Sequence, residues 1–409
     1  MPLIDSLTVR GLLSFGWQPV ELKLRALNVL IGPNGSGKSN LLDILHLLRE
    51  LPTNLQDAVR DRGGSQAWLH KGAGGDGLAM VDVVGAWVDV PAIYRAELRL
   101  GEDGLMIQAE QLRTRDGREE LHDTPLLLCL RAGSNTAAKF SKETSSKGLP
   151  TQRSAEGGQA ATALDALADR FVWERLRISP TQSILGFWPG QPLVSLVASH
   201  FRGIRIYPPW QFGPAAAVRL PQSADQPNDY LDPSGKNLGL VLSRIKQSPE
   251  AWQRVLEQFR AVYSLAKEVD IHTEGGMVQI ILDEAYRTPA SRLSDGTMRW
   301  LFLVTLLLDP QPGPMLAIEE PELGLHPDLM SRLAELLVDA AGRTQLIVTT
   351  HSPQLVSAFS DRPEDVVICE RHGGSTEFRR LDPAPLTHWL ESYSLGEAWR
   401  AGELGGNRF

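Results

Sequence analysis

The sequence predicts an α/β fold organised around a phosphate-binding loop, and three stretches support this prediction. Residues 32–39 (GPNGSGKS) fit the pattern G-x-x-x-x-G-K-S and lie between an apolar strand and a helix. Residues 315–321 form an apolar strand that ends in two glutamates, and residues 345–353 form another that ends in Thr-Thr-His-Ser-Pro. Strands buried in a parallel sheet place their carboxyl ends at the crevice where ligands bind. We therefore expect the polar ends of these strands to lie beside the loop.

The glycine-rich loop predicts binding of a nucleoside triphosphate. Its glycines let the backbone bend so that N–H groups point into an anion-sized nest. Lys38 would reach the β- and γ-phosphates, and the Ser39 hydroxyl would hold Mg²⁺. A glycine turn that merely precedes a lysine is the alternative, but the strand before the loop and the helix after it favour the phosphate site. The predicted nucleotide-binding residues are Gly32, Pro33, Asn34, Gly35, Ser36, Gly37, Lys38, Ser39 and Asn40.

Two carboxylates and a histidine at the ends of the later strands are candidates for catalysis. Glu319 could hold Mg²⁺ directly or through water, and Glu320 could orient and deprotonate the attacking water. Taken alone, two glutamates after a strand could simply enter a solvated turn, but the phosphate loop in the same chain favours the catalytic interpretation. His351 could contact the γ-phosphate or the attacking water, although a lone histidine is usually structural.

Length and composition restrict the class of protein. A chain of 409 residues exceeds the usual single core, so two lobes or domains are expected. The net charge of −8 argues against a uniformly basic nucleic-acid binder but leaves room for a local basic groove. Cys129 and Cys369 are too few for a disulfide framework or a thiolate metal site. With no visible signal peptide or membrane-length apolar run, we expect a cytoplasmic protein without a membrane segment.

The pattern along the chain predicts an antiparallel sheet near the phosphate loop and helices further on. Expected strands cover residues 3–10, 20–24, 80–90, 93–100 and 105–112. Residues 131–159 are rich in Ser, Lys, Gly and Thr, which indicates a mobile surface insertion or, alternatively, an ordered substrate loop. Expected helices cover residues 161–176, 238–245 and 249–265, and the absence of heptads argues against a long coiled coil.

A second candidate anion site precedes the apolar helix at residues 300–308. Ser294 and the N–H groups of Gly296 and Thr297 would surround the N-terminus of this helix. The alternative is an ordinary helix N-cap, with Ser294 or Asp295 as the capping residue. On this segment alone the N-cap is favoured.

The order of these elements resembles the ATP-binding-cassette ATPases, and within them the soluble RecF, SMC and OLD-type branch rather than transporter subunits. The segments EEPELGLHP (319–327) and TTHSP (349–353) are typical of the OLD/RecF-like group. The chain is also similar to a bacterial family of stand-alone predicted ATPases of the AAA type, over nearly its whole length. That similarity includes LSFG (13–16), SPTQSIL (179–185), SLGEAW (394–399) and GELGGNRF (402–409).

This resemblance implies a two-lobed head and an ATP-dependent homodimer. Residues 1–160 would form the N-terminal part of lobe I, 161–290 a largely helical lobe II, and 291–409 the signature helix and the rest of the ATPase core. Two heads would sandwich two ATP molecules, with each signature segment (Ser294, Gly296 and Thr297) closing the partner's phosphate site. Residues 323–326 would pass between the subunits.

The resemblance also assigns roles to individual residues. Glu319 takes the acid position on the Mg²⁺ side, Glu320 is the base, His351 is the γ-phosphate switch, and Gln182 couples lobe movement to Mg²⁺. Two residues depart from the pattern. Asp295 replaces the usual second glycine of the signature and brings negative charge near a phosphate, and Glu319 replaces the commoner aspartate.

Two functions from different classes follow. The first is an ATPase whose turnover opens and closes a dimer that acts on DNA or on a separately encoded effector such as a nuclease, in DNA repair or phage defence. The second is a nucleotide-gated scaffold in which turnover is incidental. Glu320 favours the first, because a scaffold that only binds ATP needs no catalytic base, whereas Asp295 leaves room for the second. About sixty residues after His351 are too few for a nuclease domain of ordinary size.

Overall fold

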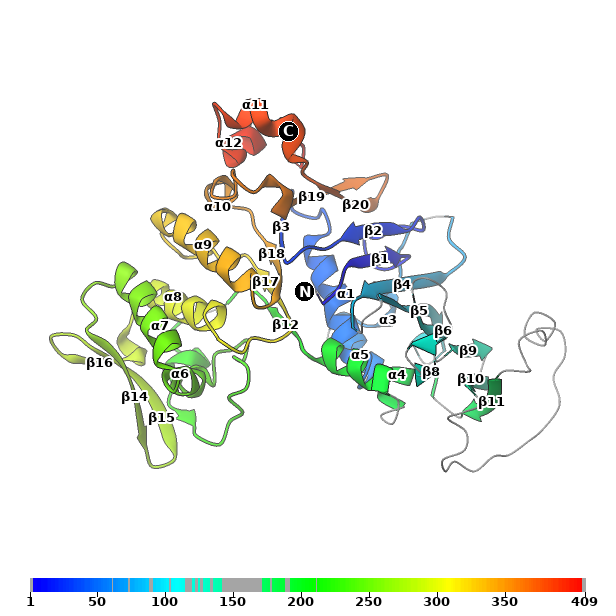
Figure 1. Cartoon of the computed structure of the whole chain (residues 1–409), viewed down its shortest axis with the longest axis horizontal. Coiled ribbons are helices and arrows are strands. Elements are labelled where there is room, and N and C mark those ends of the chain that lie inside the picture. The colour runs from blue at the N-terminus through cyan, green and yellow to red at the C-terminus, as the bar shows by residue number, and fades with distance from the viewer. Residues whose placement is uncertain are drawn as a thin grey trace. The chain divides into compact units, whose positions relative to one another are not determined.

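The computed structural model divides into two compact units. It describes residues 3–60, 62–72, 74–87, 91–102, 104–114, 120–121, 124–125, 128–132, 135–141, 171–176, 179–187, 192–210 and 212–406. Only the backbone is described for those among them that lie between 113 and 178, and for residues 187 and 192. Unit 1 comprises Met1–Leu24, Asn40–Gly203 and Arg371–Phe378, and unit 2 comprises Arg25–Ser39, Ile204–Glu370 and Arg379–Phe409 (Figure 1). The sequence predicts continuous segments, whereas these units are discontinuous. The chain changes unit within the phosphate-loop helix and again after residue 203.

Unit 2 is built on a sheet whose strands are nearly all parallel. The strand order is β12 (Ile204–Tyr207), β17 (Met315–Glu319), β18 (Gln345–Thr349), β3 (Leu27–Ile31), β19 (Val366–His372) and β20 (Ser375–Arg380). The pairs from β12 through β19 are parallel. Every residue of β3 and β18 is buried, as expected for parallel strands that are covered on both faces.

Helices and a small sheet complete unit 2. The helices are α6 (Leu238–Lys246), α7 (Pro249–Val262), α8 (Asp295–Leu307), α9 (Met330–Ala341), α10 (Pro353–Ser357), α11 (Pro383–Leu390) and α12 (Leu395–Arg400). The small sheet has the order β13 (Gln222–Ser223), β15 (Met277–Asp283), β14 (Glu268–Glu274), and β16 (Arg287–Pro289) also pairs with β15. Helix α8 is buried from Met298 to Leu307, which explains why its sequence is apolar on every side.

Unit 1 contains the predicted antiparallel sheet. Its order is β11 (Phe171–Leu176), β10 (Asn135–Ser141), β9 (Leu128–Ala132), β6 (Gly104–Thr114), β5 (Ala92–Gly101), β4 (Leu78–Gly85), β1 (Ser6–Arg10) and β2 (Val20–Lys23). Burial alternates along β4, as it does in a sheet with one face in the core. The short strands β7 (Glu120–Leu121) and β8 (Thr124–Pro125) pair with each other. The helices are α1 (Lys38–Glu50), which begins in unit 2, α2 (Leu55–Arg60), α3 (Ser65–Trp68), α4 (Ile184–Phe187) and α5 (Pro192–Arg202).

Two sequence-based expectations differ from this sheet. Residues 171–176 form a strand that pairs with β10, not the end of a helix, because pairing across the sheet outweighs a weak helical period. Within the expected insertion at 131–159, residues 135–141 form strand β10, and residues 142–159 lie outside the described part of the chain.

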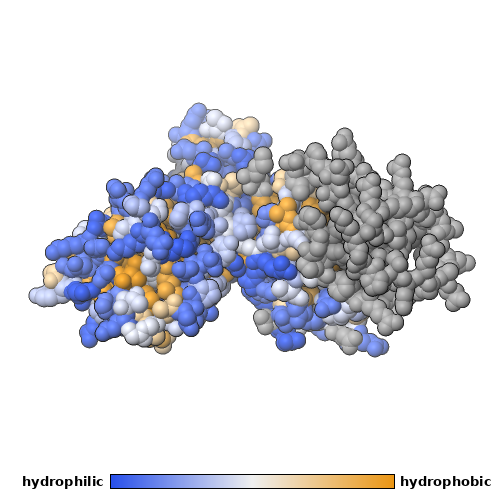
Figure 2. Space-filling view, turned by 60° about the horizontal axis from the view of Figure 1, so that its bottom comes forward, coloured by the Kyte–Doolittle hydropathy of each residue, from blue (hydrophilic) through white to orange (hydrophobic). Residues whose placement is uncertain are grey.

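Hydrophilic residues cover much of the coloured surface in Figure 2, with apolar residues in groups among them. Among the described side chains, the exposed large apolar ones are Leu220, Tyr230, Leu265, Met277, Tyr286, Leu323, Trp389 and Tyr393. In the part of the chain that the structure describes, no helix combines the length and apolar character needed to cross a membrane.

The core assignment of α8 predicts a large loss of stability on truncation. Phe302 is fully buried among Tyr207, Trp210 and Phe212. Phe302→Ala should lower the free energy of unfolding by about 3–5 kcal/mol, because it leaves a cavity among these rings. Urea denaturation measures the change. Tyr286→Ala, at a side chain 84% exposed, is the matched control and should change stability by less than about 0.5 kcal/mol. Equal effects of the two substitutions would contradict the assignment.

Candidate active site

The phosphate loop has a backbone that only glycine can adopt at its first position. Gly32 follows the buried strand β3 directly and has a φ of 150°. A methyl group added there would lie 2.1 Å from the carbonyl oxygen of Cys369, so no side chain fits. Gly35, at the exposed tip, has a φ of 78° but open space around it. The loop therefore has the tight, glycine-dependent bend that a phosphate cradle requires.

Lys38 lies against this loop. Its side-chain nitrogen Nζ donates hydrogen bonds to the carbonyl oxygens of Gly32 (2.8 Å) and Pro33 (3.1 Å). Burial lowers the pKa of Lys38, whereas the neighbouring carboxylates Glu320 and Glu319 act in the opposite direction. The ammonium group is thus placed between the loop and two acids, as a phosphate-binding lysine should be.

Ser39 and Glu319 lie together, as a shared metal site requires. The Ser39 hydroxyl donates to Oε1 of Glu319 over 2.5 Å. The pair forms because α1 begins directly after the loop and β17 ends at Glu319, opposite Thr349 of β18. A hydroxyl and a carboxylate are oxygen ligands of the kind that Mg²⁺ prefers, so these residues fit that ion.

The remaining expected metal residue is in the other unit. Gln182 lies in unit 1, in the turn before α4, and its role toward the metal stays a prediction. Asn40, predicted to bind nucleotide, also lies in unit 1, where its amide donates to Oγ of Ser14 (2.6 Å). The described residues contain no group of three or more His, Cys, Asp or Glu that could hold a metal ion by itself. Mg²⁺ at Ser39 would therefore take further ligands from phosphate and water.

Glu320 has a strained backbone and a perturbed carboxyl group. Its φ of 48° is unusual for a residue with a side chain and costs about 1–3 kcal/mol. The Glu320 N–H donates to the carbonyl oxygen of Thr349 (2.9 Å), which holds this turn against β18. Burial raises the pKa of Glu320, and the charges of Glu322 and Glu319 raise it further. A carboxylate with a raised pKa is a better proton acceptor than an ordinary glutamate.

His351 lies beside Glu320 at the end of the neighbouring strand. Its Nε2 atom is 3.6 Å from Oε1 of Glu320. Burial lowers the pKa of His351, and the charge of Lys38 lowers it further, so the neutral ring is favoured. The structure thus places together the two residues predicted to contact the attacking water and the γ-phosphate.

Sequence reasoning missed the role of Glu322. This buried carboxylate accepts hydrogen bonds at Oε1 from the Thr350 hydroxyl (2.6 Å) and from the His351 N–H (3.0 Å). It therefore joins the turn after β17 to the turn after β18 and fixes the backbone of His351. The only signal in the sequence is a third acid in the stretch Glu-Glu-Pro-Glu.

The signature segment contains a helix N-cap, which was the simpler of the two interpretations. Ser294 caps α8, where its Oγ accepts from the Thr297 N–H (3.1 Å) and lies 2.7 Å from the Thr297 hydroxyl. Gly296 lies close to the turn at Gly324, since a methyl group added to Gly296 would be 3.6 Å from the Gly324 carbonyl oxygen. The exposed residues Leu323 and His326 flank that turn. The cap therefore uses the Thr297 N–H that was expected to face an anion, whereas the Gly296 N–H is not part of the cap.

Asp295, the departure from the signature pattern, has a cationic partner. Its Oδ1 accepts from Nη2 of Arg219 over 2.5 Å. The Arg219 side chain is 4% exposed and also donates to the carbonyl oxygens of Phe212 (2.7 Å), Ala290 (3.1 Å) and Leu293 (2.5 Å). The negative charge expected to oppose a phosphate is therefore balanced within the chain. Nothing near position 295 in the sequence indicates this partner.

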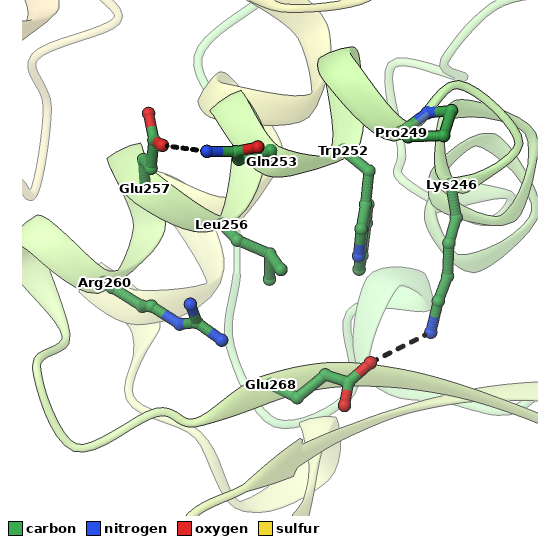
Figure 3. A pocket seen from close by; sticks show the side chains of 8 residues that line it. All are labelled: Lys246, Pro249, Trp252, Gln253, Leu256, Glu257, Arg260 and Glu268. Carbon is green, nitrogen blue, oxygen red and sulfur yellow. Dashed lines mark hydrogen bonds and ion pairs between the residues drawn. The ribbon is translucent and has the colours of Figure 1, made fainter.

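A surface pocket of about 530 Å³ lies elsewhere in unit 2 and contains none of these residues. Trp252 and Leu256 point into it from α7 (Figure 3). Lys246 pairs with Glu268 (3.3 Å) and lies 5.3 Å from the centre of the Trp252 ring. Lys246 is thus paired within the pocket, and the guanidinium of Arg260, which also lines it, donates to the carbonyl oxygen of Lys267.

The fold is found in known structures. A crystal structure of an SMC head bound to the C-winged helix domain of ScpA has 14% sequence identity and a TM-score of 0.54, covering 94% of this chain and 99% of the other. An SMC head with an extended coiled coil, bound to the C-terminal domain of ScpA and derived from Pyrococcus furiosus, has 12% identity and a TM-score of 0.50, covering 96% and 99%. These likenesses show that the chain has the fold of SMC head domains. No curated protein matches the sequence.

A sequence-family match agrees with this fold. The family described as "AAA domain, putative AbiEii toxin, Type IV TA system" matches residues 27–115 and 188–357, well over half of the chain. The match includes the phosphate loop, the signature segment, both glutamates and His351. The chain therefore belongs to this AAA-domain family of P-loop ATPases.

Proposed function

We propose that the chain hydrolyses ATP with Mg²⁺ and works as a switch that dimerises head to head around ATP. The observation that carries this proposal is the cluster at the carboxyl ends of β17 and β18. There, Ser39 contacts Glu319 (2.5 Å), and His351 lies 3.6 Å from Glu320, with Lys38 buried beside these acids. Such a cluster can bind triphosphate on one side and activate water on the other.

Each residue in the cluster has a distinct part. The loop N–H groups and Lys38 bind the phosphates, and Ser39 with Glu319 holds Mg²⁺, which when bound neutralises phosphate charge. Glu320 accepts the proton of the attacking water, favoured by its raised pKa. His351 positions the γ-phosphate or the water, with its backbone held by Glu322.

The proposal extends to the assembly and its partners. Two chains would each close the other's site through Ser294, Gly296 and Thr297, with Asp295 tolerated because Arg219 balances its charge. Gln182 would couple movement of its lobe to Mg²⁺. The dimer would act in the cytoplasm on DNA, on a separately encoded effector such as a nuclease, or on both, in DNA repair or phage defence. Protein partners of similar folds support an effector, since two SMC heads were solved bound to ScpA domains.

A nucleotide-gated scaffold is the second candidate. The observation that favours it is the carboxylate of Asp295, which is 64% exposed at the signature turn although it pairs with Arg219, and would slow ATP-driven closure by facing the phosphate. Turnover would then be incidental to binding.

The first prediction from this proposal separates binding from catalysis. Glu320→Gln should retain ATP binding but lose about 10²–10⁴-fold in turnover, because it lacks the base. Lys38→Ala should lose binding itself. Phosphate release and equilibrium binding of a fluorescent ATP analogue measure the two steps. Glu335→Gln, at an exposed position on α9, is the matched control and should behave as wild type. Wild-type turnover in Glu320→Gln would refute the assignment of the base.

The second prediction concerns a site shared between chains. One chain has one phosphate loop and one signature segment. A mixture of Lys38→Ala and Ser294→Arg chains should therefore recover part of the ATPase activity that each variant lacks alone, since a mixed dimer keeps one intact composite site. Activity would be measured across mixing ratios. Absence of recovery at every ratio would count against the shared site.

The third prediction concerns the Asp295–Arg219 pair. Arg219→Met should weaken ATP-driven dimerisation roughly tenfold, about the effect of a 1.4 kcal/mol change, because Asp295 would face the phosphate unbalanced. Adding Asp295→Asn should restore most of the affinity, although it cannot replace the three carbonyl contacts of Arg219. Sedimentation with ATP measures the association. If the double variant were as weak as Arg219→Met, the loss would come from packing and not from charge.

A further inference from the structure

The C-terminal residues 394–406 have no part in the proposed function, yet they pack behind the phosphate loop. The N–H of Gly406 donates to Oε1 of Glu370 over 2.6 Å. Glu370 lies on β19, the strand that pairs with the phosphate-loop strand β3. A methyl group added to Gly406 would lie 2.9 Å from Cγ2 of Ile368 and 3.7 Å from the Cα atom of Gly32.

Strand β19 supports the loop from the same side. The carbonyl oxygen of Cys369 occupies the space that a side chain on Gly32 would need, at 2.1 Å from an added methyl group. The Cys369 thiol donates to the carbonyl oxygen of Ser36 (3.3 Å). Gly406 thus contacts β19, and β19 contacts the phosphate loop. A displacement of Gly406 would therefore shift β19 and, through it, Gly32.

Several polar contacts hold residues 404–406 beside β19. The carbonyl oxygen of Leu404 accepts from Nη2 of Arg379 (2.5 Å), and that of Gly406 accepts from Nε1 of Trp399 (3.4 Å). Gly405 and Gly406 have φ values of 74° and 71°, which side chains rarely adopt. Leu404 is buried. Leu404 and Gly406 are therefore part of the packed unit.

Helix α12 (Leu395–Arg400), which precedes these residues, packs against α10, the helix that follows His351. A methyl group added to Gly396 of α12 would lie 1.9 Å from the carbonyl oxygen of Pro353, the first residue of α10. The Ser394 and Ser357 hydroxyls are 3.0 Å apart, and the N–H of Leu395 donates to the Ser360 hydroxyl (2.9 Å). Helix α10 begins two residues after His351. One C-terminal segment therefore packs against β19, which supports the phosphate loop, and against the helix that follows His351.

We propose that residues 394–406, called here the C-terminal clamp, position the phosphate loop for nucleotide binding through Gly406 and Glu370. This inference rests on the proposed function only in that the loop binds ATP. Glu370 and Gly406 are positioning residues, because neither would touch the nucleotide. A clamp that loosens would lower the fraction of chains with a competent loop and would weaken apparent affinity by the same factor.

The test compares two glycine substitutions in the full chain. Gly406→Ala places a methyl group against Ile368 and Gly32, whereas Gly374→Ala adds similar backbone strain, with a φ of 88°, where no atom lies within 4 Å. Gly406→Ala should bind a fluorescent ATP analogue about three- to tenfold more weakly, as expected when the competent fraction falls by that factor. Gly374→Ala should bind like wild type, and Lys38→Ala is the non-binding reference. The thermal midpoint of both glycine variants without nucleotide shows whether a loss of affinity accompanies a loss of stability.

A second pair of variants makes the test independent of the glycine. Glu370→Ala removes the acceptor for the Gly406 N–H, whereas Glu370→Gln keeps an acceptor oxygen at that position. Affinity should fall in Glu370→Ala and be largely retained in Glu370→Gln. If Gly406→Ala does not fold, the comparison of Glu370→Ala with Glu370→Gln tests the proposal by itself. Wild-type affinity in both Gly406→Ala and Glu370→Ala would overturn the clamp. Absence of ATP binding by the wild type would instead overturn the proposed function on which the clamp rests.

Discussion

The parallel register of β17, β18 and β3 is the constraint on which the candidate site depends. Glu319 lies opposite Thr349, and Thr349 lies opposite Leu30, so the three strands end at the same level. Their interiors are buried, and a buried charge without a partner is costly. The only charged residue in these three strands, Glu319, is therefore the last residue of β17, and there it meets the phosphate loop.

This crowding of charge explains the chemistry of the site. The charges of Glu320 and Glu319 oppose the lowering of the Lys38 pKa by burial, and the charges of Glu322 and Glu319 add to the effect of burial in raising the pKa of Glu320. A site that bears surplus negative charge beside a lysine and a hydroxyl suits a metal cation together with a polyanion. The strained backbone of Glu320 indicates that the surrounding structure holds this carboxylate in place.

The sequence predicted the features that depend on short segments. The strand at 27–31, the loop, the helix after it and the two acidic strand ends are each encoded by a local pattern, and the structure contains them. The features that were missed depend on residues far apart in the chain. Arg219 reaches Asp295 from 76 positions away, and Glu322 contacts His351 across the gap between two strands. No periodicity or spacing in these segments predicts a contact between residues so far apart in the chain.

The strand at 171–176 was mispredicted for the same reason. Its sequence, FVWERL, allows a helix or a strand, and pairing with β10 decides the outcome. The C-terminal motifs were recognisable in the sequence, but their position behind Gly32 required the structure. Short-range patterns thus predict the candidate site residues of this protein, and long-range packing determines which other residues hold their side chains in place.

The most direct test of the account is a structure of the full chain with a non-hydrolysable ATP analogue and Mg²⁺. The account predicts triphosphate in the loop at residues 32–39, Mg²⁺ on the Ser39 hydroxyl with Glu319 beside it, and the γ-phosphate within reach of Lys38 and His351. Nucleotide bound away from this loop, or a metal ion held without Ser39 and Glu319, would contradict it.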